Sequence, residues 1–336
     1  MNVQDFLENI QPNEKMGILS HIDLDGIVSE ILFYDFLNKK GCKNISVFFR
    51  DYNVNLMDEL HEELENLDKL VVLDLSSNVL GEQFQKLGNE KDILYIDHHF
   101  SEIHFSGRII ELKTPSEICV TRTLYETLKN KLGKKREWLV VAGIISDAGD
   151  RFEINNEIIN HFLKTINLSI QDFKEKIVFN LAYFLDYFHD DLTGAFHILR
   201  DLDNYSDVSK LEKYIQPVKD EFNFYLNDFK KNKKRINGVE FYLFNSKFPI
   251  KSSLINELSY STPRDIFLIG TLEGDFIKFS ARCQSGKINL VEFLKTIGAG
   301  CENALSGGHL KAAGIVIRKQ DLEIFKNNLM TLKNIS

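Results

Sequence analysis

The sequence predicts an α/β protein, in which a parallel-sheet domain with a helical half is followed by a smaller α/β domain. Two patterns predict this fold class. Short apolar runs alternate with helical patterns from residue 16 to residue 112, and a second alternation of strands and helices begins at residue 239. Parallel strands need crossover connections, which helices usually supply. The length of 336 residues also favours two domains, because single cores rarely exceed ~250–300 residues.

Each predicted element of the first sheet rests on an apolar run or on helical spacing. The runs at 69–75 and 92–97 are apolar at consecutive positions, which is typical of strands buried on both faces of a sheet. In chain order, the predicted elements are strand 16–21, helix 26–41, strand 44–49, helix 54–67, strand 69–75, helix 80–88, strand 92–97 and strand 108–112.

Residues 116–205 are predicted to form the helical half, because apolar residues recur there at positions i, i+3 and i+4. The stretch 208–235 predicts one long polar-faced helix that ends in a basic run. The expected domains are therefore 1–205 and 239–336, joined by a connector at 206–238. The second domain is expected to contain strands 239–245, 265–272, 274–282 and 312–318, and helices at 254–258, at 288–298 and from residue 321.

Charge and composition argue against several classes of protein. With 41 Lys and Arg residues against 49 Asp and Glu, the net charge is −8, which disfavours a bulk electrostatic coat on nucleic acid. The first residues lack a signal-peptide pattern and no apolar stretch approaches ~18 residues, so we expect a cytoplasmic protein without a membrane partner. The four cysteines form no CxxC pair, which argues against a disulfide framework and a cysteine zinc site.

The first chemically informative cluster follows the strand predicted at 16–21. His21, Asp23 and Asp25 lie where a strand ends and a helix begins, and ligands of parallel sheets bind at the carboxyl ends of strands. Alternate residues of an extended segment point to the same side, so these polar groups would converge and need a cation. The alternative is that Asp25 caps the following helix and Asp23 is simply exposed.

Acidic residues and histidines also end two later strands. Asp74 closes one of them, Asp97, His98 and His99 close the next, and Asp147 ends an apolar helical segment that could return it to the same edge. Three strands that end in this way are difficult to explain by structural roles alone. Carboxylate and imidazole ligands without a thiolate suit Mn²⁺ or a related divalent ion, and their number is enough for two ions.

These motifs resemble those of the DHH phosphoesterase superfamily. The residues similar to its four catalytic motifs are the segment from His21 to Gly26, Asp74, the triplet Asp97, His98 and His99, and Asp147. Two later segments resemble the glycine-rich motif of the DHHA1 substrate-binding domain, Ser306, Gly307, Gly308 and His309 with Ala312, Ala313 and Gly314. One departure is that Ser306 stands where the family has the first of three glycines. The opening motif is most like that of nanoRNase B-type oligoribonucleases.

The resemblance implies a centre of two Mn²⁺ ions, with Mg²⁺ or Co²⁺ as substitutes, and makes Asp74 and His99 catalytic residues. Asp74 would bridge the ions. Asp23 and His21 would hold one ion, and Asp25, His98 and Asp147 the other. His99 would face the scissile phosphate. Two ions ~3.5–4 Å apart can activate water and clamp the attacking and leaving oxygens of an in-line displacement.

The second domain is expected to bind the substrate. Arg282 ends a predicted strand, and its planar side chain can bind phosphate through two N–H groups, with Ser280 as a further donor. The segment 306–308 would let backbone N–H groups approach an anion, and His309 could donate to phosphate or stack on a base. Taken singly, Arg282 could form a surface salt bridge and the two glycines a turn.

The function implied by the resemblance is Mn²⁺-dependent hydrolysis of short oligoribonucleotides to nucleoside 5′-monophosphates, in a cleft between the two domains. The partners would be short RNA or dinucleotides, and the sequence is compatible with a homodimer. The alternatives are a 3′-phosphoadenosine 5′-phosphate phosphatase, a linear or cyclic dinucleotide phosphodiesterase, and a catalytically silent nucleotide sensor. The sensor is disfavoured because every acidic and histidine position that the mechanism needs is present.

Overall fold

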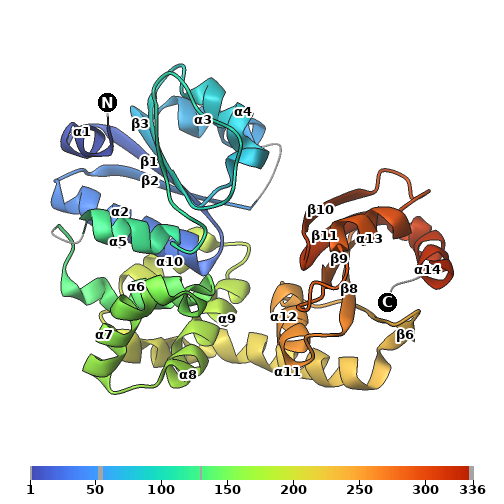
Figure 1. The fold of residues 1–336 in the computed structure, drawn as a ribbon. Helices are drawn as coiled ribbons and strands as arrows, with labels where there is room; N and C mark the ends of the chain where they lie inside the picture. Colours follow the sequence, from blue (N-terminus) through green and yellow to red (C-terminus); the bar gives the residue numbers. More distant parts are fainter. Residues whose placement is uncertain (1, 52–55, 129–130, 333–336) are drawn as a thin grey trace. The chain divides into compact units, whose positions relative to one another are not determined.

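A computed structural model describes residues 2–51, 56–128 and 131–332. The chain separates into two compact units, Met1–Ile215 and Gln216–Ser336, and each has its own sheet (Figure 1). The first residues of the helix predicted at 54–67 lie outside the described residues. None of the helices that the structure describes is both long and apolar enough to cross a membrane.

The first unit is built on a five-stranded parallel sheet, which confirms the predicted fold class. Its strand order is β2-β1-β3-β4-β5, and every neighbouring pair is parallel. The strands are β1 (Lys15–His21), β2 (Asn44–Arg50), β3 (Lys69–Leu73), β4 (Asp92–Asp97) and β5 (Ile109–Lys113). The helices are α1 (Val3–Glu8), α2 (Leu24–Lys39), α3 (Leu56–Glu65), α4 (Ser77–Leu87), α5 (Val120–Leu128), α6 (Glu137–Ser146), α7 (Asn156–Ile166), α8 (Ile170–Phe173), α9 (Phe179–Tyr187) and α10 (Leu192–Arg200).

Both faces of this sheet are buried, as the uninterrupted apolar runs predict. Leu70 and Val72 of β3 pack on one face with α3 and α4, whereas Val71 and Leu73 point to the other face. There they join α2 and the helices that follow β5, so the helical half extends this second core. Figure 1 shows α3 and α4 on one side of the sheet and α2 and α5 on the other.

The strand order determines which polar residues meet. Because β1, β3 and β4 are parallel neighbours, their carboxyl ends lie at one edge of the sheet. Asp74 follows β3 directly and adopts a left-handed backbone with a φ of 61°, while its N–H donates to the carbonyl of Ile96 at 3.0 Å. Left-handed backbone is uncommon for residues other than glycine and tends to be kept at functional sites.

The second unit contains a six-stranded mixed sheet with the order β10-β11-β9-β8-β7-β6. The strands are β6 (Lys234–Ile236), β7 (Val239–Phe244), β8 (Ile266–Glu273), β9 (Phe276–Arg282), β10 (Leu305–His309) and β11 (Ala312–Arg318). Its helices are α12 (Lys251–Ser261), α13 (Leu290–Ile297), α14 (Leu322–Thr331) and most of α11 (Glu212–Asn232), whose first residues belong to the first unit. Phe279 of β9 packs against α13 and α14 on one face, and Figure 1 shows α12 on the opposite face.

Two segments of the second half differ from the prediction. The helix predicted at 208–235 spans Glu212–Asn232, because its first residues belong to a 3-10 helix, Tyr205–Leu211, and its last residues enter β6. Asn237 and Gly238 both have positive φ and form the tight hairpin that pairs β6 with β7. Residues 305–309, whose glycines are also typical of a turn, form strand β10 and pair with β11.

Candidate metal centre

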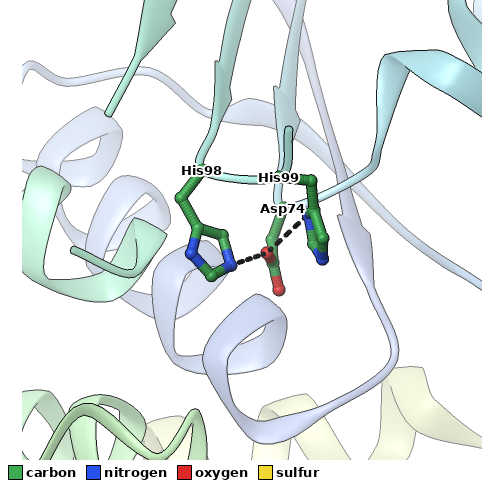
Figure 2. A group of neighbouring side chains, drawn as sticks. All are labelled: Asp74, His98 and His99. Carbon is green, nitrogen blue, oxygen red and sulfur yellow. Dashed lines mark ion pairs between the residues drawn. The ribbon is translucent and has the colours of Figure 1, made fainter. Parts of the chain in front are cut away.

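Asp74 lies at the centre of a cluster of acidic and imidazole side chains. Its side chain is 2% exposed, and its Oδ1 lies 3.4 Å from Nε2 of His98 and 3.8 Å from Nδ1 of His99 (Figure 2). Its Oδ2 lies 3.9 Å from Nδ1 of His21. Within the described chain, Oδ1 accepts no hydrogen bond. A buried carboxylate oxygen that lacks a donor but faces imidazole nitrogens fits a bound cation.

His21 and Asp23 approach Asp74 from the end of β1. Asp23 caps α2 by accepting from the N–H of Gly26 at 3.0 Å, and its other oxygen lies 3.0 Å from Nδ1 of His21. A Cβ on Gly26 would lie 2.2 Å from the carbonyl oxygen of His21, so this turn needs glycine. Asp51, just after β2, lies 3.6 Å from Nε2 of His21. Asp51 was not among the predicted site residues, although it also follows a strand at this edge.

His98 presents Nε2 to the cluster. Its Nδ1 lies 3.2 Å from the carbonyl oxygen of Ser116, which can only accept, so the proton sits on Nδ1. Nε2 then points its lone pair toward Oδ1 of Asp74 and lies 3.7 Å from Oδ2 of Asp147. This arrangement, with one ring nitrogen fixed by a backbone carbonyl, is typical of histidines that bind metals.

His99 is held differently. The ring nitrogen that approaches Asp74 is Nδ1, and this atom already makes a 2.7 Å hydrogen bond to Oδ1 of Asp97. Asp97 is fully buried and also accepts from Nζ of Lys113 at 2.8 Å and from the hydroxyl of Tyr95 at 3.0 Å. Burial alone would raise the pKa of Asp97, but the hydrogen bond from His99 and the Lys113 charge hold it well below its usual range. Asp97 therefore orients His99, a role that the sequence did not reveal.

Asp25 and Asp147 lie at the edge of the cluster. The structure brings the ligand atoms of two groups within 4.8 Å, His21, Asp23 and Asp74 in one and Asp74, His98 and His99 in the other. Both oxygens of Asp25 accept backbone N–H groups at the start of α5, from Val120 at 3.0 Å and Thr121 at 2.9 Å. Asp25 thus caps α5, and Asp23 caps α2.

The electrostatics of the cluster favour a bound cation. Burial raises the pKa of Asp74 well above its usual value, and the charges of Asp25 and Asp23 raise it further. Burial and the Asp25 charge also raise the pKa of Asp147 to about 7. Burial by itself would lower the pKa of His21, but Asp23 and its neighbours raise it to about 11. Ionising these acids together would therefore concentrate more negative charge than their protein partners offset, and a divalent cation would relieve that repulsion.

The strand register of the second unit brings four of the predicted substrate-binding residues onto one face of its sheet. Two rows of paired residues cross β9, β11 and β10. One row consists of Arg282, Ala312 and His309, and the other consists of Ser280, Gly314 and Gly307. Directly opposed residues of antiparallel strands share a face. The middle position of each row is alanine or glycine, so no long side chain stands between the arginine and the histidine.

Arg282 is a half-buried cation with only neutral hydrogen-bond acceptors. Its Nε donates to Oδ1 of Asn256 on α12 at 3.1 Å, and its Nη1 donates to the carbonyl of Ala281 at 3.0 Å. Burial lowers the pKa of its guanidinium. No carboxylate of the described residues pairs with it, so its charge is available to an anion. Asn256, which holds the guanidinium, was not predicted from the sequence.

The net charges of the two units have opposite signs. The first unit has 23 Lys and Arg against 37 Asp and Glu, a net charge of −14, and the second has 18 against 12, a net charge of +6. The acidic unit carries the candidate metal ligands, and the basic unit carries Arg282. The second unit therefore suits an anionic ligand by itself, whereas the first needs bound cations before it can attract one.

The two glycines of β10 differ in their backbone conformation and in the space around them. Gly308 has a φ of 133°, and an added Cβ would lie 2.5 Å from the carbonyl oxygen of Ala312. An added Cβ on Gly307 would meet nothing within 4 Å, so the backbone there is open to a ligand. Ser306 pairs with Ile315, a core residue, so its side chain lies on the face opposite to Gly307 and His309.

We expect Gly308→Ala and Gly307→Ala to affect different properties. Gly308→Ala should lower the free energy of unfolding by about 1–3 kcal/mol, because the methyl group must displace backbone atoms. Gly307→Ala should leave the stability unchanged and weaken the binding of small phosphate-containing ligands. Urea unfolding and calorimetric titration measure both properties. Equal destabilisation by the two variants would contradict this division.

Comparisons with known proteins identify the first unit. Residues 15–145 match the DHH family, N-terminal domain. No curated protein matches the chain significantly in sequence. RecJ from Thermus thermophilus, in complex with Mn²⁺, has a TM-score of 0.72 at 15% identity over 97% of this chain. This chain covers 53% of that RecJ, so it spans about half of its length.

Two further solved structures share the fold. An exonuclease RecJ bound to manganese has a TM-score of 0.71 at 14% identity, with 97% of this chain and 92% of that chain covered. The pGpG-specific phosphodiesterase PggH from Vibrio cholerae has a TM-score of 0.50 at 10% identity, with 95% and 98% covered. The family match contains every strand of the first sheet and the clustered side chains from His21 to His99. Residues 15–145 of this chain are therefore a DHH family N-terminal domain.

Proposed function

We propose that this chain is a metal-dependent phosphodiesterase that hydrolyses short oligoribonucleotides to nucleoside 5′-monophosphates. The observation that carries the proposal is the buried Asp74 carboxylate, which is surrounded by histidines from the ends of β1 and β4 and lacks a hydrogen-bond donor on Oδ1 within the described chain. The compared structures support the reaction class, because one is described as an exonuclease and another as a phosphodiesterase.

The donor set fits divalent cations such as Mn²⁺. In this proposal His21, Asp23 and Asp74 hold one ion, and Asp25, Asp74, His98 and Asp147 hold the other. Carboxylate oxygens and imidazole nitrogens both suit Mn²⁺, and the two RecJ structures contain manganese. When bound, two such ions supply Lewis-acid activation of water and offset the charge of the phosphodiester.

The protein's own residues orient the reacting groups. Ser116 fixes the tautomer of His98, so Nε2 is its ligand atom. Asp97 fixes the ring of His99 through Nδ1, so Nε2 is the atom through which His99 would contact the substrate phosphate. Because Nδ1 donates to Asp97, Nε2 becomes a donor when the ring carries a second proton, and a donor held there stabilises the negative charge that develops on the phosphate.

The second unit would bind the other phosphates of the substrate. Arg282 offers a desolvated charge and Ser280 a hydroxyl, while Gly307 leaves its backbone open and His309 shares the row of Arg282. Ser306 and Gly308 would contribute through the backbone alone, since the side chain of Ser306 lies on the opposite face. Short RNA offers several phosphates to these groups, whereas a mononucleotide offers one.

The test is a substrate panel with the purified full chain and Mn²⁺. Di- to hexaribonucleotides, cyclic dinucleotides and 3′-phosphoadenosine 5′-phosphate are compared by kcat/KM. We expect the highest values for linear oligoribonucleotides of a few residues, with nucleoside 5′-monophosphates as products. A higher kcat/KM for 3′-phosphoadenosine 5′-phosphate, or no hydrolysis of any substrate, would overturn the proposal.

A second candidate is a phosphodiesterase that acts on dinucleotides alone. The fold shared with the pGpG-specific phosphodiesterase favours this candidate. The same panel separates the two functions. A dinucleotide-specific enzyme would lose most of its kcat/KM between the dinucleotide and the trinucleotide, whereas an oligoribonuclease would retain activity on longer substrates.

We expect Arg282→Ala to lower kcat/KM on a pentaribonucleotide about ten- to a hundredfold, and to leave hydrolysis of bis-p-nitrophenyl phosphate nearly unchanged. A charge-assisted contact of this kind is worth roughly 1.5–3 kcal/mol. The small diester carries a single phosphate, which the bound metal ions would engage, so it has none left for Arg282. The salt dependence of binding should also fall, because one phosphate contact is lost.

The matched control is Arg318→Ala. Arg318 lies on the same sheet but pairs with Glu302 at 3.2 Å, so its removal should leave both substrates unaffected. An equal loss on both substrates in Arg282→Ala would place Arg282 in the chemical step or the fold. No loss on either substrate would mean that Arg282 does not contact the substrate.

A further inference from the structure

Phe100 is the most exposed of the large apolar side chains that the structure describes, with 78% of its surface accessible. It follows His99 directly in the sequence. Single exposed apolar residues are common on protein surfaces, so exposure alone does not indicate a role. The surroundings of Phe100 are what distinguish it.

The backbone around Phe100 is fixed by the start of α4. The carbonyl of Phe100 accepts a 2.7 Å hydrogen bond from Nδ2 of Asn78. The Oγ of the next residue, Ser101, accepts a 2.6 Å hydrogen bond from the hydroxyl of Ser77 and another from the N–H of Ile103. The chain therefore holds Phe100 in a fixed position on both sides, yet leaves its ring in water.

We infer that the ring of Phe100 is the surface on which a base of the substrate stacks, next to the phosphate that His99 contacts. This inference rests on the proposed function. Consecutive Cα atoms are about 3.8 Å apart, so a nucleotide whose phosphate touches His99 lies within reach of the next side chain. The residues on either side in the sequence, His99 and Ser101, are polar, so Phe100 is the one apolar side chain of this three-residue stretch.

A single exposed ring fits a nucleobase better than a protein partner. Protein docking sites usually need a contiguous apolar patch of a few hundred Å², whereas base stacking needs one aromatic face. Stacking also tolerates different bases, because every base has a π-face, which suits an enzyme that degrades short RNA of any sequence. Because a hydrogen bond already holds the backbone of Phe100, only its side-chain torsions lose freedom when the base binds.

The test compares ligands that differ only in the base. Binding of AMP and of ribose 5-phosphate is measured by calorimetry for the full chain, and hydrolysis is measured for ApA and for the same dinucleotide with one base absent. Phe100→Ala should weaken AMP binding and lower kcat/KM on ApA roughly tenfold to a hundredfold. Ribose 5-phosphate binding and bound Mn²⁺ should stay unchanged.

Three comparisons make the result decisive. Phe100→Trp should restore AMP binding, and Phe100→Leu should restore little of it, because leucine has no π-face. Phe224→Ala, which removes another exposed ring (62%) from α11, should have no effect. An equal loss on ligands with and without a base, or full rescue by leucine, would overturn the inference. The proposed function fails separately, if the wild-type protein hydrolyses no phosphodiester.

Discussion

Replacing Asp74 is expected to abolish both metal binding and activity while leaving the fold intact. In the proposed centre this carboxylate is shared by two ions, so its loss removes a ligand from each of them. Asp74→Asn is the variant of choice, because asparagine tolerates the left-handed backbone at a φ of 61° better than alanine does. Bound Mn²⁺ per chain and kcat on a pentaribonucleotide should both fall to background.

The same variant should stabilise the metal-free protein. Burial and neighbouring carboxylates raise the pKa of Asp74 in the folded state. A raised folded-state pKa means that ionisation near neutral pH opposes folding, so removal of the charge relieves that cost. Urea unfolding without metal should show Asp74→Asn at least as stable as the wild type.

The matched control is Asp92→Ala, which removes an aspartate from the opposite end of β4, where it pairs with Arg108. This variant should keep both its metal and its activity. Wild-type turnover with two bound ions per chain in Asp74→Asn would contradict the two-metal proposal. Loss of folded structure in Asp74→Asn without metal would contradict the electrostatic argument.

Substitutions of His98 and His99 are expected to impair different properties, metal binding and turnover. His98→Ala should lose Mn²⁺, because Nε2 faces Asp74 and Asp147 while Nδ1 is fixed by Ser116. His99→Ala should keep Mn²⁺ and lose ~10²–10³ in kcat, as expected when one donor to a developing charge is removed. The difference follows from the nitrogen that each ring turns toward Asp74.

Asp97→Asn tests the positioning of His99 without removing the ring. The amide weakens the 2.7 Å hydrogen bond to Nδ1, so kcat should fall while KM and bound Mn²⁺ stay close to those of the wild type. Calorimetric Mn²⁺ titration of the three variants measures the metal directly. Equal loss of Mn²⁺ in His98→Ala and His99→Ala would place both rings in the coordination shell.

Local sequence patterns were sufficient to predict the parallel sheet of the first unit and the residues at the ends of its strands. Apolar runs such as Leu70–Leu73 can be read locally, because a strand buried on both faces needs apolar residues at every position. Asp74 and the Asp97 to His99 segment follow such runs, so their place at the carboxyl ends also follows from local pattern.

Contacts between distant segments determine which of these residues meet and through which atoms. The order β1-β3-β4 places His21, Asp74 and His98 side by side, and strand order depends on packing between distant segments. The tautomer of each histidine depends on partners that lie elsewhere in the chain, Ser116 for His98, or just before it, Asp97 for His99.

The second unit shows most clearly what local sequence patterns leave undetermined. From the sequence, a pair of glycines is compatible with a turn or with a strand. Only the pairing of β10 with β11 shows that an added Cβ would clash at Gly308 and would meet nothing at Gly307. The face that Arg282 shares with His309 depends on register across three strands. Side-chain direction reverses with every residue of a strand, so such a face is set by long-range hydrogen bonds rather than by local sequence.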